Sequence, residues 1–278
     1  MKDISIIIIN INNSQLLKEC LQSIEKSSPQ ASLEIIVVDN GSTDGSQQMI
    51  KTDFPQVRLM ANQENLGFAK ANNQGLRVCQ GRYALLLNND TIVKAGALDQ
   101  MVKFMDTNPQ AGACGPKLLN LDGTIQRQGG LLGKRFYFST KPITVDFVIG
   151  ACLMVRKEVI DQVGLMDENL FFYNDDLDWC LSIRKAGHKI YFLPQAEVIH
   201  YGGYSSKTFN PQLFIEGFKG GLYFCKKHYG TLAYNAYRSL LLILLLILSL
   251  SPNGDRRKAY REIITIARRG QIPNPMVK

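Results

Sequence analysis

Residues 34–45 read EIIVVDNGSTDG. The run at 34–38, in which four β-branched apolar residues follow Glu34, ends at an aspartate and a polar, glycine-containing turn. Such a run is typical of a strand that is buried on both faces of a parallel sheet. Runs of the same form occupy residues 4–9, 57–61 and 83–87. Helical patterns lie between the runs, at residues 14–26, 44–51 and 67–79. Strands alternating with helices predict an α/β fold in which a mostly parallel sheet is flanked by helices.

The chain beyond residue 90 departs from this simple alternation. Residues 120–141 are rich in glycine and polar side chains, which predicts a loop or hairpin across the front of the sheet. Helices are expected at residues 95–105, 157–163 and 211–228, and strands at residues 112–118, 189–193 and 197–200. The last third of the chain therefore reads as a helical extension of the α/β part.

The composition excludes several classes of protein. The chain has 278 residues, 45% apolar and 20% charged, and a mean hydropathy of −0.07, which excludes disordered, collagen-like and polytopic membrane proteins. The six cysteines are scattered without a CxxC pair, as expected for reduced thiols in a cytosolic protein. The first strand begins almost at the first residue, so no secretion signal is expected.

The positive charge is concentrated near the C-terminus. Residues 231–278 hold eight Lys or Arg against two Asp or Glu, which accounts for six of the eight net charges. This distribution argues against a nucleic-acid-binding face and for an anionic partner at the C-terminal region. Residues 232–250 are mostly apolar, so they form either a core helix or a membrane-seated helix. The nearby Arg256 and Arg257 favour the membrane interpretation, because arginines match anionic headgroups.

Polar side chains follow several of the predicted strands. Asp39 ends the second strand, and residues 88–90 (Asn-Asn-Asp) follow the fourth. Ligands bind outside the carboxyl ends of strands in open α/β sheets, and Asp90 offers a hard oxygen for a divalent cation. A turn at Asp39 and a helix cap at Asp90 are the alternative readings.

Two more constellations lie in the later part of the chain. Three aspartates at positions 175, 176 and 178 follow three aromatic residues. Crowded carboxylates repel one another, which raises the proton affinity of one of them and makes it a plausible general base. The same aspartates could instead favour a helix N-terminus. His200 ends a strand before Gly202 and Gly203, where an imidazole could complete a metal site or serve a structural role.

Taken together and in this order, these motifs resemble the family 2 inverting glycosyltransferases of the GT-A fold, in particular the bacterial rhamnosyltransferase-like branch. The similarity spans about residues 4–206. The matching segments are residues 5–12, 38–45, 65–73, 87–90, 150–153, 175–178 and 200–203. Each segment alone is weak evidence for the family, but seven segments in the family's order are specific evidence for it.

The resemblance implies a role for each matched residue. The residues implied in binding the nucleotide-sugar donor are Asn10, Asp39, Asn65, Gly67, Asn72, Asn88 and Asn89. Asp39 would contact the nucleobase. Residues 88–90 occupy the place of the family's DxD motif, and Asp90 and His200 would hold Mg²⁺ or Mn²⁺ against the diphosphate.

The resemblance also implies the catalytic base. Asp176 matches the aspartate of the family's Glu-Asp pair, which deprotonates the acceptor hydroxyl so that displacement inverts the anomeric centre. Two positions depart from the pattern, because Asn88 replaces the first acid of DxD and Asp175 replaces the glutamate. The choice of base between Asp175 and Asp176 therefore stays open, and the register through Trp179 favours Asp176.

The resulting hypothesis is a metal-dependent inverting glycosyltransferase that works in cell-surface polysaccharide synthesis. It would move a sugar, with rhamnose from dTDP-rhamnose as the candidate, to a saccharide or lipid-linked acceptor at the inner face of the cell membrane. The expected domains are a GT-A domain at 1–206, with a nucleotide-binding half (1–118) and an acceptor half (119–206), and a membrane-associating region at 207–278. The main rival is a non-catalytic nucleotide-sugar-binding or scaffold protein. A nucleotidyltransferase or an NAD enzyme is disfavoured, because no glycine-rich phosphate loop follows the first strand.

Overall fold

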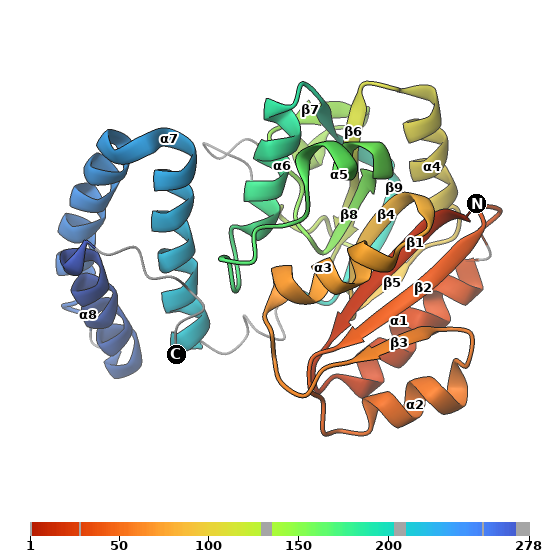
Figure 1. Ribbon diagram of the computed structural model, residues 1–278, viewed down its shortest axis with the longest axis horizontal. Helices are drawn as coiled ribbons and strands as arrows, with labels where there is room; N and C mark the ends of the chain where they lie inside the picture. Colours follow the sequence, from red (N-terminus) through yellow and green to blue (C-terminus); the bar gives the residue numbers. More distant parts are fainter. Residues whose placement is uncertain (1, 28, 129–134, 203–209, 252, 271–278) are drawn as a thin grey trace. The chain divides into compact units, whose positions relative to one another are not determined.

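Strand β1 (Lys2–Asn10) lies between two parallel neighbours, β2 (Leu33–Asp39) and β4 (Gly81–Asn88), and β3 (Arg58–Ala61) extends the sheet beyond β2 (Figure 1). The computed structural model describes residues 2–27, 29–128, 135–202, 210–251 and 253–270. The helices that connect these strands are α1 (Ser14–Ser27), α2 (Ser46–Asp53) and α3 (Phe68–Val78). The predicted alternation of strands and helices is confirmed in this half of the sheet.

The second half of the sheet mixes directions. Its elements are β5 (Thr91–Val93), α4 (Ala97–Thr107), β6 (Ala111–Leu119), the 3-10 turn η2 (Phe136–Phe138), β7 (Ile143–Val145), β8 (Cys152–Arg156), α5 (Lys157–Val163), α6 (Asp175–Lys185) and β9 (Lys189–His200). Strand β8 runs antiparallel to β4 and β6, while β6 and β9 are parallel. The α/β fold is confirmed, and its parallel character belongs mainly to β1–β4. The two short strands expected at 189–193 and 197–200 form one strand, β9, with a register shift against β6.

The core lies on both faces of the sheet, because successive side chains of β1 point to opposite faces. Ile4, Ile6 and Ile8 pack on one face with α1 and α4, whereas Ile7 packs on the other with α3 and α6. All six cysteines are free, as the sequence predicts. Burial raises the pKa of Cys20 to about 12, which keeps this thiol protonated at neutral pH.

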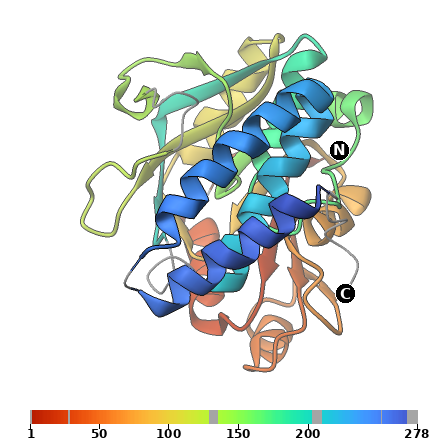
Figure 2. The same ribbon diagram turned by 90° about the vertical axis from the view of Figure 1, so that its left-hand side faces the viewer.

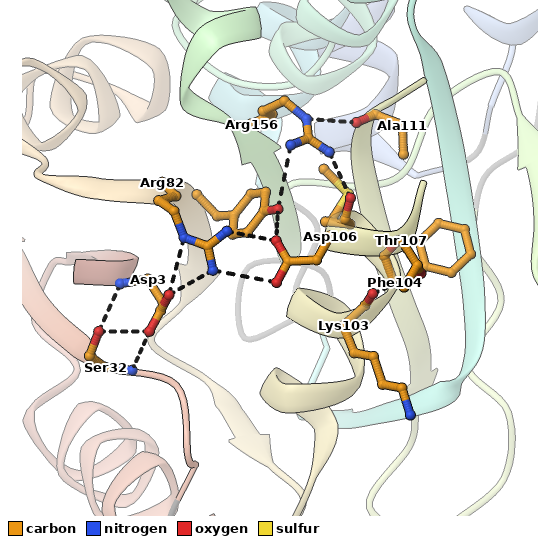
Figure 3. A network of polar contacts seen from close by, with 11 residues as sticks. Asp3, Ser32, Arg82, Lys103, Phe104, Asp106, Thr107, Ala111 and Arg156 are labelled. Carbon is orange, nitrogen blue, oxygen red and sulfur yellow. Dashed lines mark hydrogen bonds and ion pairs between the residues drawn. The ribbon is translucent and has the colours of Figure 1, made fainter. Parts of the chain in front are cut away.

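A network of charged side chains fastens the amino ends of β1 and β4 (Figure 3). The Arg82 guanidinium donates to Asp3 Oδ1 at 2.7 Å and to Asp106 Oδ1 at 2.6 Å, and the Tyr83 hydroxyl donates to the same Asp106 oxygen at 2.6 Å. Hydrogen bonds from Arg82 and Ser32 hold the pKa of Asp3 well below its usual range. Ligands of open α/β sheets bind at the carboxyl ends of strands, so this network is structural.

The described residues divide into two compact units. Residues 2–166 and 176–202 form the first, and residues 167–175 with 210–270 form the second. The expected domain boundary at 206/207 lies outside the described residues, as do Gly203 and residues 129–134 of the predicted loop. The second unit contains α7 (Pro211–Leu248) and α8 (Gly254–Arg269), which pack against each other (Figure 2). Gly230 interrupts α7 with φ +80° and ψ −177°, so the element is two helices joined at a kink.

Asp167 ties the first segment of the second unit to α7. Its Oδ2 accepts from the Tyr223 hydroxyl at 2.8 Å and from Lys227 Nζ at 2.7 Å, and its Oδ1 accepts from Asn169 N at 3.0 Å. Burial alone raises the pKa of this carboxyl, but the bonds from Lys227, Asn169 and Tyr223 outweigh burial and lower the pKa to about 2. The folded state therefore favours the ionised carboxylate.

We expect Asp167→Ala to lower the free energy of unfolding by about 2 kcal/mol at pH 7, measured by urea denaturation. Because the folded pKa lies below the unfolded value, this contribution is present above about pH 4 and is lost as the pH falls through about 2. The control is Asp161→Ala, which removes an exposed ion pair with Lys157 on α5 and should change stability by less than about 0.5 kcal/mol. Equal stability of Asp167→Ala and the parent at pH 7 would refute this account.

Candidate functional site

The register of the first strands brings three polar residues to one edge of the sheet. Asn10 of β1 pairs with Asp39 of β2, and the preceding Ile9 pairs with Asn88 of β4. Asn10 then links the neighbouring strand ends, because its Nδ2 donates to Asp39 Oδ2 at 3.0 Å and its Oδ1 accepts from Asn89 Nδ2 at 2.7 Å. Asn10, Asp39, Asn88 and Asn89 therefore lie together, as the sequence predicts.

Asp39 is buried and anchors the turn that follows β2. Its Oδ1 accepts from Ser42 N at 2.9 Å and from Gln47 Nε2 at 2.8 Å. Both carboxylate oxygens thus receive protein donors, although an ionised carboxylate can accept about four hydrogen bonds. The structure gives Asp39 a structural role in shaping this loop, in addition to the predicted contact with a nucleobase.

The residues predicted around α3 fall into two groups. Asn65 and Gly67 shape the loop before the helix, where Asn65 Oδ1 accepts from Gly67 N at 3.0 Å and from Asn40 Nδ2 at 3.2 Å. Gly67 has φ +82°, a conformation that favours glycine. Asn72 is buried inside α3 and donates to Phe68 O at 3.1 Å, so its side chain is engaged within the helix.

Asp90 and His200 are brought together by the pairing of β5 with β9. Thr91 pairs with His200, and Asp90 O accepts from Tyr201 N at 2.9 Å. His200 Nε2 lies 3.3 Å from Asp90 Oδ1 and 3.3 Å from Asn88 Nδ2. The predicted pair, separated by 110 positions in the sequence, therefore forms one cluster with Asn88.

Gln126, which the sequence analysis did not single out, orients His200. Its Nε2 donates to His200 O at 3.1 Å and to Asn120 Oδ1 at 3.3 Å, so its Oε1 is the atom that faces His200 Nδ1 at 2.7 Å. A carbonyl oxygen accepts only, so His200 Nδ1 donates to Gln126, and Nε2 is the ring nitrogen that faces Asp90 and Asn88. A short hairpin positions Gln126, since Leu119 bridges Ile125 and Gln126 N donates to Leu118 O.

The donor set of this cluster fits a divalent cation. A carboxylate oxygen and an imidazole nitrogen stand 3.3 Å apart, with about a tenth of each side chain exposed. No group of three His, Cys, Asp or Glu side chains with metal-ligand geometry occurs in the described ranges. Two protein ligands suit a cation such as Mg²⁺ or Mn²⁺, which takes most of its coordination from phosphate oxygens and water.

Asp176 stands near the start of α6 and is connected to Asn88 through the segment before β8. Asp176 Oδ2 accepts from Gly150 N at 3.0 Å and its Oδ1 accepts from Leu177 N at 2.8 Å, while the adjacent Ala151 O accepts from Asn88 N at 3.0 Å. A Cβ at Gly150 would lie 3.0 Å from the Phe68 ring, so a side chain there would disturb this close approach. The matched segment 150–153 thus joins the polar strand end to the candidate base.

Partial burial raises the pKa of Asp176, and the N–H groups of Gly150 and Leu177 oppose part of that rise. Asp175, the alternative base, is buried and belongs to the second unit with residues 167–174. Trp179 fixes α6 by donating from Nε1 to Gly164 O at 3.0 Å. The two neighbouring carboxylates therefore differ in setting, and the hydrogen bonds above connect Asp176 to the polar strand end.

A hollow of about 570 Å³ lies elsewhere in the first unit, beside β7 and the end of the predicted loop. Its lining includes Phe136, Asp146, Phe147, Arg184 and His188. None of the predicted site residues lines it, so the polar cluster at the strand ends is a separate feature.

Sequence and structure comparisons show which known proteins this chain is similar to. The family model described as glycosyl transferase family 2 matches residues 5–164. The N-acetylglucosaminyl-diphospho-decaprenol L-rhamnosyltransferase of Mycobacterium tuberculosis is 29% identical, over 63% of this chain and 68% of that protein. The dTDP-rhamnosyl transferase RfbF of Shigella flexneri is 27% identical, over 60% of this chain and 59% of that protein. Among solved structures, the mannosyltransferase PcManGT of Pyrobaculum calidifontis, in complex with GDP-Man and Mn²⁺, matches with a TM-score of 0.63 at 18% identity, over 99% of this chain and 88% of that one.

Proposed function

The chain belongs to glycosyl transferase family 2 and is a glycosyltransferase, and from this premise we propose that it moves a sugar from a nucleotide-sugar donor to a saccharide or lipid-linked acceptor. The observation that carries this proposal is the connected cluster at the strand ends. Hydrogen bonds run from Asn88 through Ala151 and Gly150 to Asp176, and Asn88 also contacts His200. These hydrogen bonds support a proposal in which the donor-diphosphate site and the basic carboxylate are positioned by the same backbone segment, residues 150–151.

Each part of the cluster has a distinct task in the proposed reaction. Asp90 Oδ1 and His200 Nε2 would hold Mg²⁺ or Mn²⁺, which takes up negative charge as the nucleoside diphosphate leaves. Asn10, Asn89 and the loop shaped by Asp39 and Asn65 line the donor side. The mannosyltransferase PcManGT, which shares the fold, is in complex with GDP-Man and Mn²⁺, which supports this assignment.

Asp176 is the base in this proposal. It accepts the proton of an acceptor hydroxyl while that oxygen attacks the anomeric carbon from the side opposite the diphosphate, so the configuration inverts. Burial raises the pKa of Asp176, which makes its carboxylate a stronger base toward this proton. Asp175 remains the alternative base, and the variants in the Discussion separate the two.

The donor and acceptor are proposed from the relatives. Two of them are rhamnosyltransferases, and the name of one specifies a decaprenol-linked acceptor. We therefore propose rhamnose from dTDP-rhamnose as the first donor to test and a lipid-linked acceptor of cell-surface polysaccharide synthesis. We propose that the protein meets this acceptor at the cytoplasmic face of the membrane, in contact with anionic lipid through its C-terminal helices.

Thermal stabilisation tests the donor site. A ligand that binds only the native state raises the melting temperature by mass action. We expect one nucleoside diphosphate and its sugar nucleotide to raise the Tm by several degrees with Mn²⁺ and by much less without it. Turnover of the stabilising sugar nucleotide with a lipid-linked acceptor extract would then identify the sugar that is transferred and the class of acceptor. Lack of stabilisation by every nucleotide in the panel would contradict the donor site.

A further inference from the structure

The second half of α7 is apolar on its outward face as well as on its packed face. Leu241 and Leu245 are buried against α8, as expected for a helical pair. On the opposite side, Ile243 is 60% exposed, Ile247 63% and Leu250 82%. Large side chains that remain exposed on this half-helix are Leu232, Tyr237, Leu240, Ile243, Leu244, Leu246 and Ile247, with Leu250 just beyond it. Apolar residues all round a helix indicate a second apolar environment.

Helix α8, which packs on the other face of α7, supplies the charge of this region. Its buried side, which includes Tyr260, Ile263 and Ile264, packs on α7. Its exposed basic side chains are Arg256, Arg257, Lys258, Arg261, Arg268 and Arg269, against Asp255 and Glu262. The α7–α8 hairpin, defined as residues 231–270 without the undescribed residue 252, therefore joins an exposed apolar strip to an exposed cationic helix.

We propose that the α7–α8 hairpin lies in the plane of an anionic bilayer surface, with the outward face of α7 among the acyl chains and the arginines of α8 at the lipid phosphates. The inference deepens the membrane contact of the proposed function and rests on that proposal for its biological setting. An apolar face beside basic side chains is the pattern of helices that lie in the membrane interface. The predicted membrane-seated helix thereby acquires an orientation that the sequence alone left open.

The packing of α8 argues against a helix that crosses the membrane. Residues 231–248 span about 27 Å, so by length and composition α7 could cross a bilayer. Because α8 packs along α7, a crossing hairpin would carry Lys258, Arg261 and Glu262 into the hydrocarbon, where charged side chains are strongly disfavoured. An in-plane hairpin leaves these side chains in the headgroup layer.

The same charges argue against a second copy of the chain as the occupant of the apolar face. Two hairpins that met through their outward α7 faces would hold both α8 helices on the far sides, so the exposed basic side chains would gain no anionic partner. An anionic bilayer instead offers a complementary charge and an apolar layer in one surface.

Vesicle flotation of the full chain tests whether the α7–α8 hairpin binds an anionic bilayer. We expect binding to vesicles of an equal mixture of phosphatidylglycerol and phosphatidylcholine to exceed binding to phosphatidylcholine alone by at least about tenfold, and to weaken with added salt. The pair Ile243→Glu and Ile247→Glu should abolish binding to both. The triple variant Arg257→Gln, Arg261→Gln and Arg268→Gln should lose mainly the preference for anionic vesicles.

A matched control places the same charge on an exposed aromatic residue of the first unit. Phe138 is 59% exposed, and Phe138→Glu should bind vesicles as the parent does. Nucleotide-dependent thermal stabilisation is measured for each variant, so loss of vesicle binding with intact nucleotide binding separates this proposal from the donor-site proposal. Failure of the parent chain to bind anionic vesicles, or its assembly into an oligomer that Ile243→Glu dissolves, would overturn the proposal.

Tryptophan depth measurements test the orientation. Leu232 and Ile243 lie on one face of α7, and Leu250 follows its end. Single replacements of these residues by tryptophan can be quenched with lipids brominated at different depths. The native Trp179 is 1% exposed, so it contributes a constant background. An in-plane hairpin predicts the same shallow depth at all three positions. A deep position at Ile243 between two shallow ends would show a crossing helix and refute the in-plane placement.

Discussion

Asp176→Asn is expected to lower kcat for sugar transfer by about 10²- to 10⁴-fold, the range over which a positioned general base contributes. An amide cannot accept the hydroxyl proton, although it keeps the size of the side chain and can accept one of the two N–H bonds that Asp176 receives. Because Asp176 is connected to the donor cluster through the backbone of Gly150 and Ala151, we expect the affinity for the nucleotide sugar to change little. Transfer kinetics together with nucleotide-dependent thermal stabilisation measure the two quantities separately.

The control variants decide which of the two adjacent carboxylates, Asp175 or Asp176, is the base. Asp175→Asn should retain substantial kcat if Asp176 is the base, and Glu158→Gln, an exposed carboxylate of α5, should leave kcat unchanged. The rate should also depend on pH in a defined direction. Since burial raises the pKa of Asp176, activity should fall on acidification at a pH above the ordinary aspartate range, because protonation removes the base. Full activity of a folded Asp176→Asn protein would contradict the assignment.

The sequence predicted the strand ends because each buried strand is a continuous apolar run that stops at a polar residue. Asp39 and residues 88–90 follow such runs, and parallel strands bring their carboxyl ends to one edge. The hydrogen bonds between them depend on register, which an apolar run without alternation does not specify. That Asn10 would link Asp39 to Asn89 therefore required the structure.

Gln126 and the division between Asp175 and Asp176 illustrate what sequence patterns omit. Gln126 contacts His200 across 74 positions through a hairpin in a segment that has no helical or strand periodicity. Nothing local distinguishes it from other polar loop residues. The two aspartates are neighbours in the chain, yet the contacts of α6 and the preceding segment assign them to different units. Long-range packing, which no local pattern encodes, decides both the contact of Gln126 with His200 and the separation of Asp175 from Asp176.

Asp90→Ala is expected to remove most of the Mn²⁺-dependent stabilisation by nucleoside diphosphate and to abolish transfer. Asp90 supplies the only carboxylate within the described cluster at His200, so its loss leaves one neutral nitrogen ligand for the cation. Mn²⁺ binding measured by electron paramagnetic resonance, with nucleoside diphosphate present, reports this effect without relying on turnover. The matched control is Glu197→Gln on β9, whose carboxylate pairs with Lys94 and Lys117 and should not affect Mn²⁺ affinity.

Gln126→Leu should weaken Mn²⁺ binding by about 10- to 100-fold, less than loss of Asp90, because it acts on the metal only through His200. Leucine removes the acceptor at Nδ1, so the imidazole can present either nitrogen as N–H and loses the fixed lone pair at Nε2. We expect the loss of Mn²⁺ affinity to be largest for Asp90→Ala, intermediate for Gln126→Leu and absent for Glu197→Gln. If Gln126→Leu binds Mn²⁺ as tightly as the parent, the hydrogen bond to Nδ1 has no part in presenting the ligand. If Asp90→Ala also does so, the cation is held elsewhere and the donor-diphosphate site must be assigned to other residues.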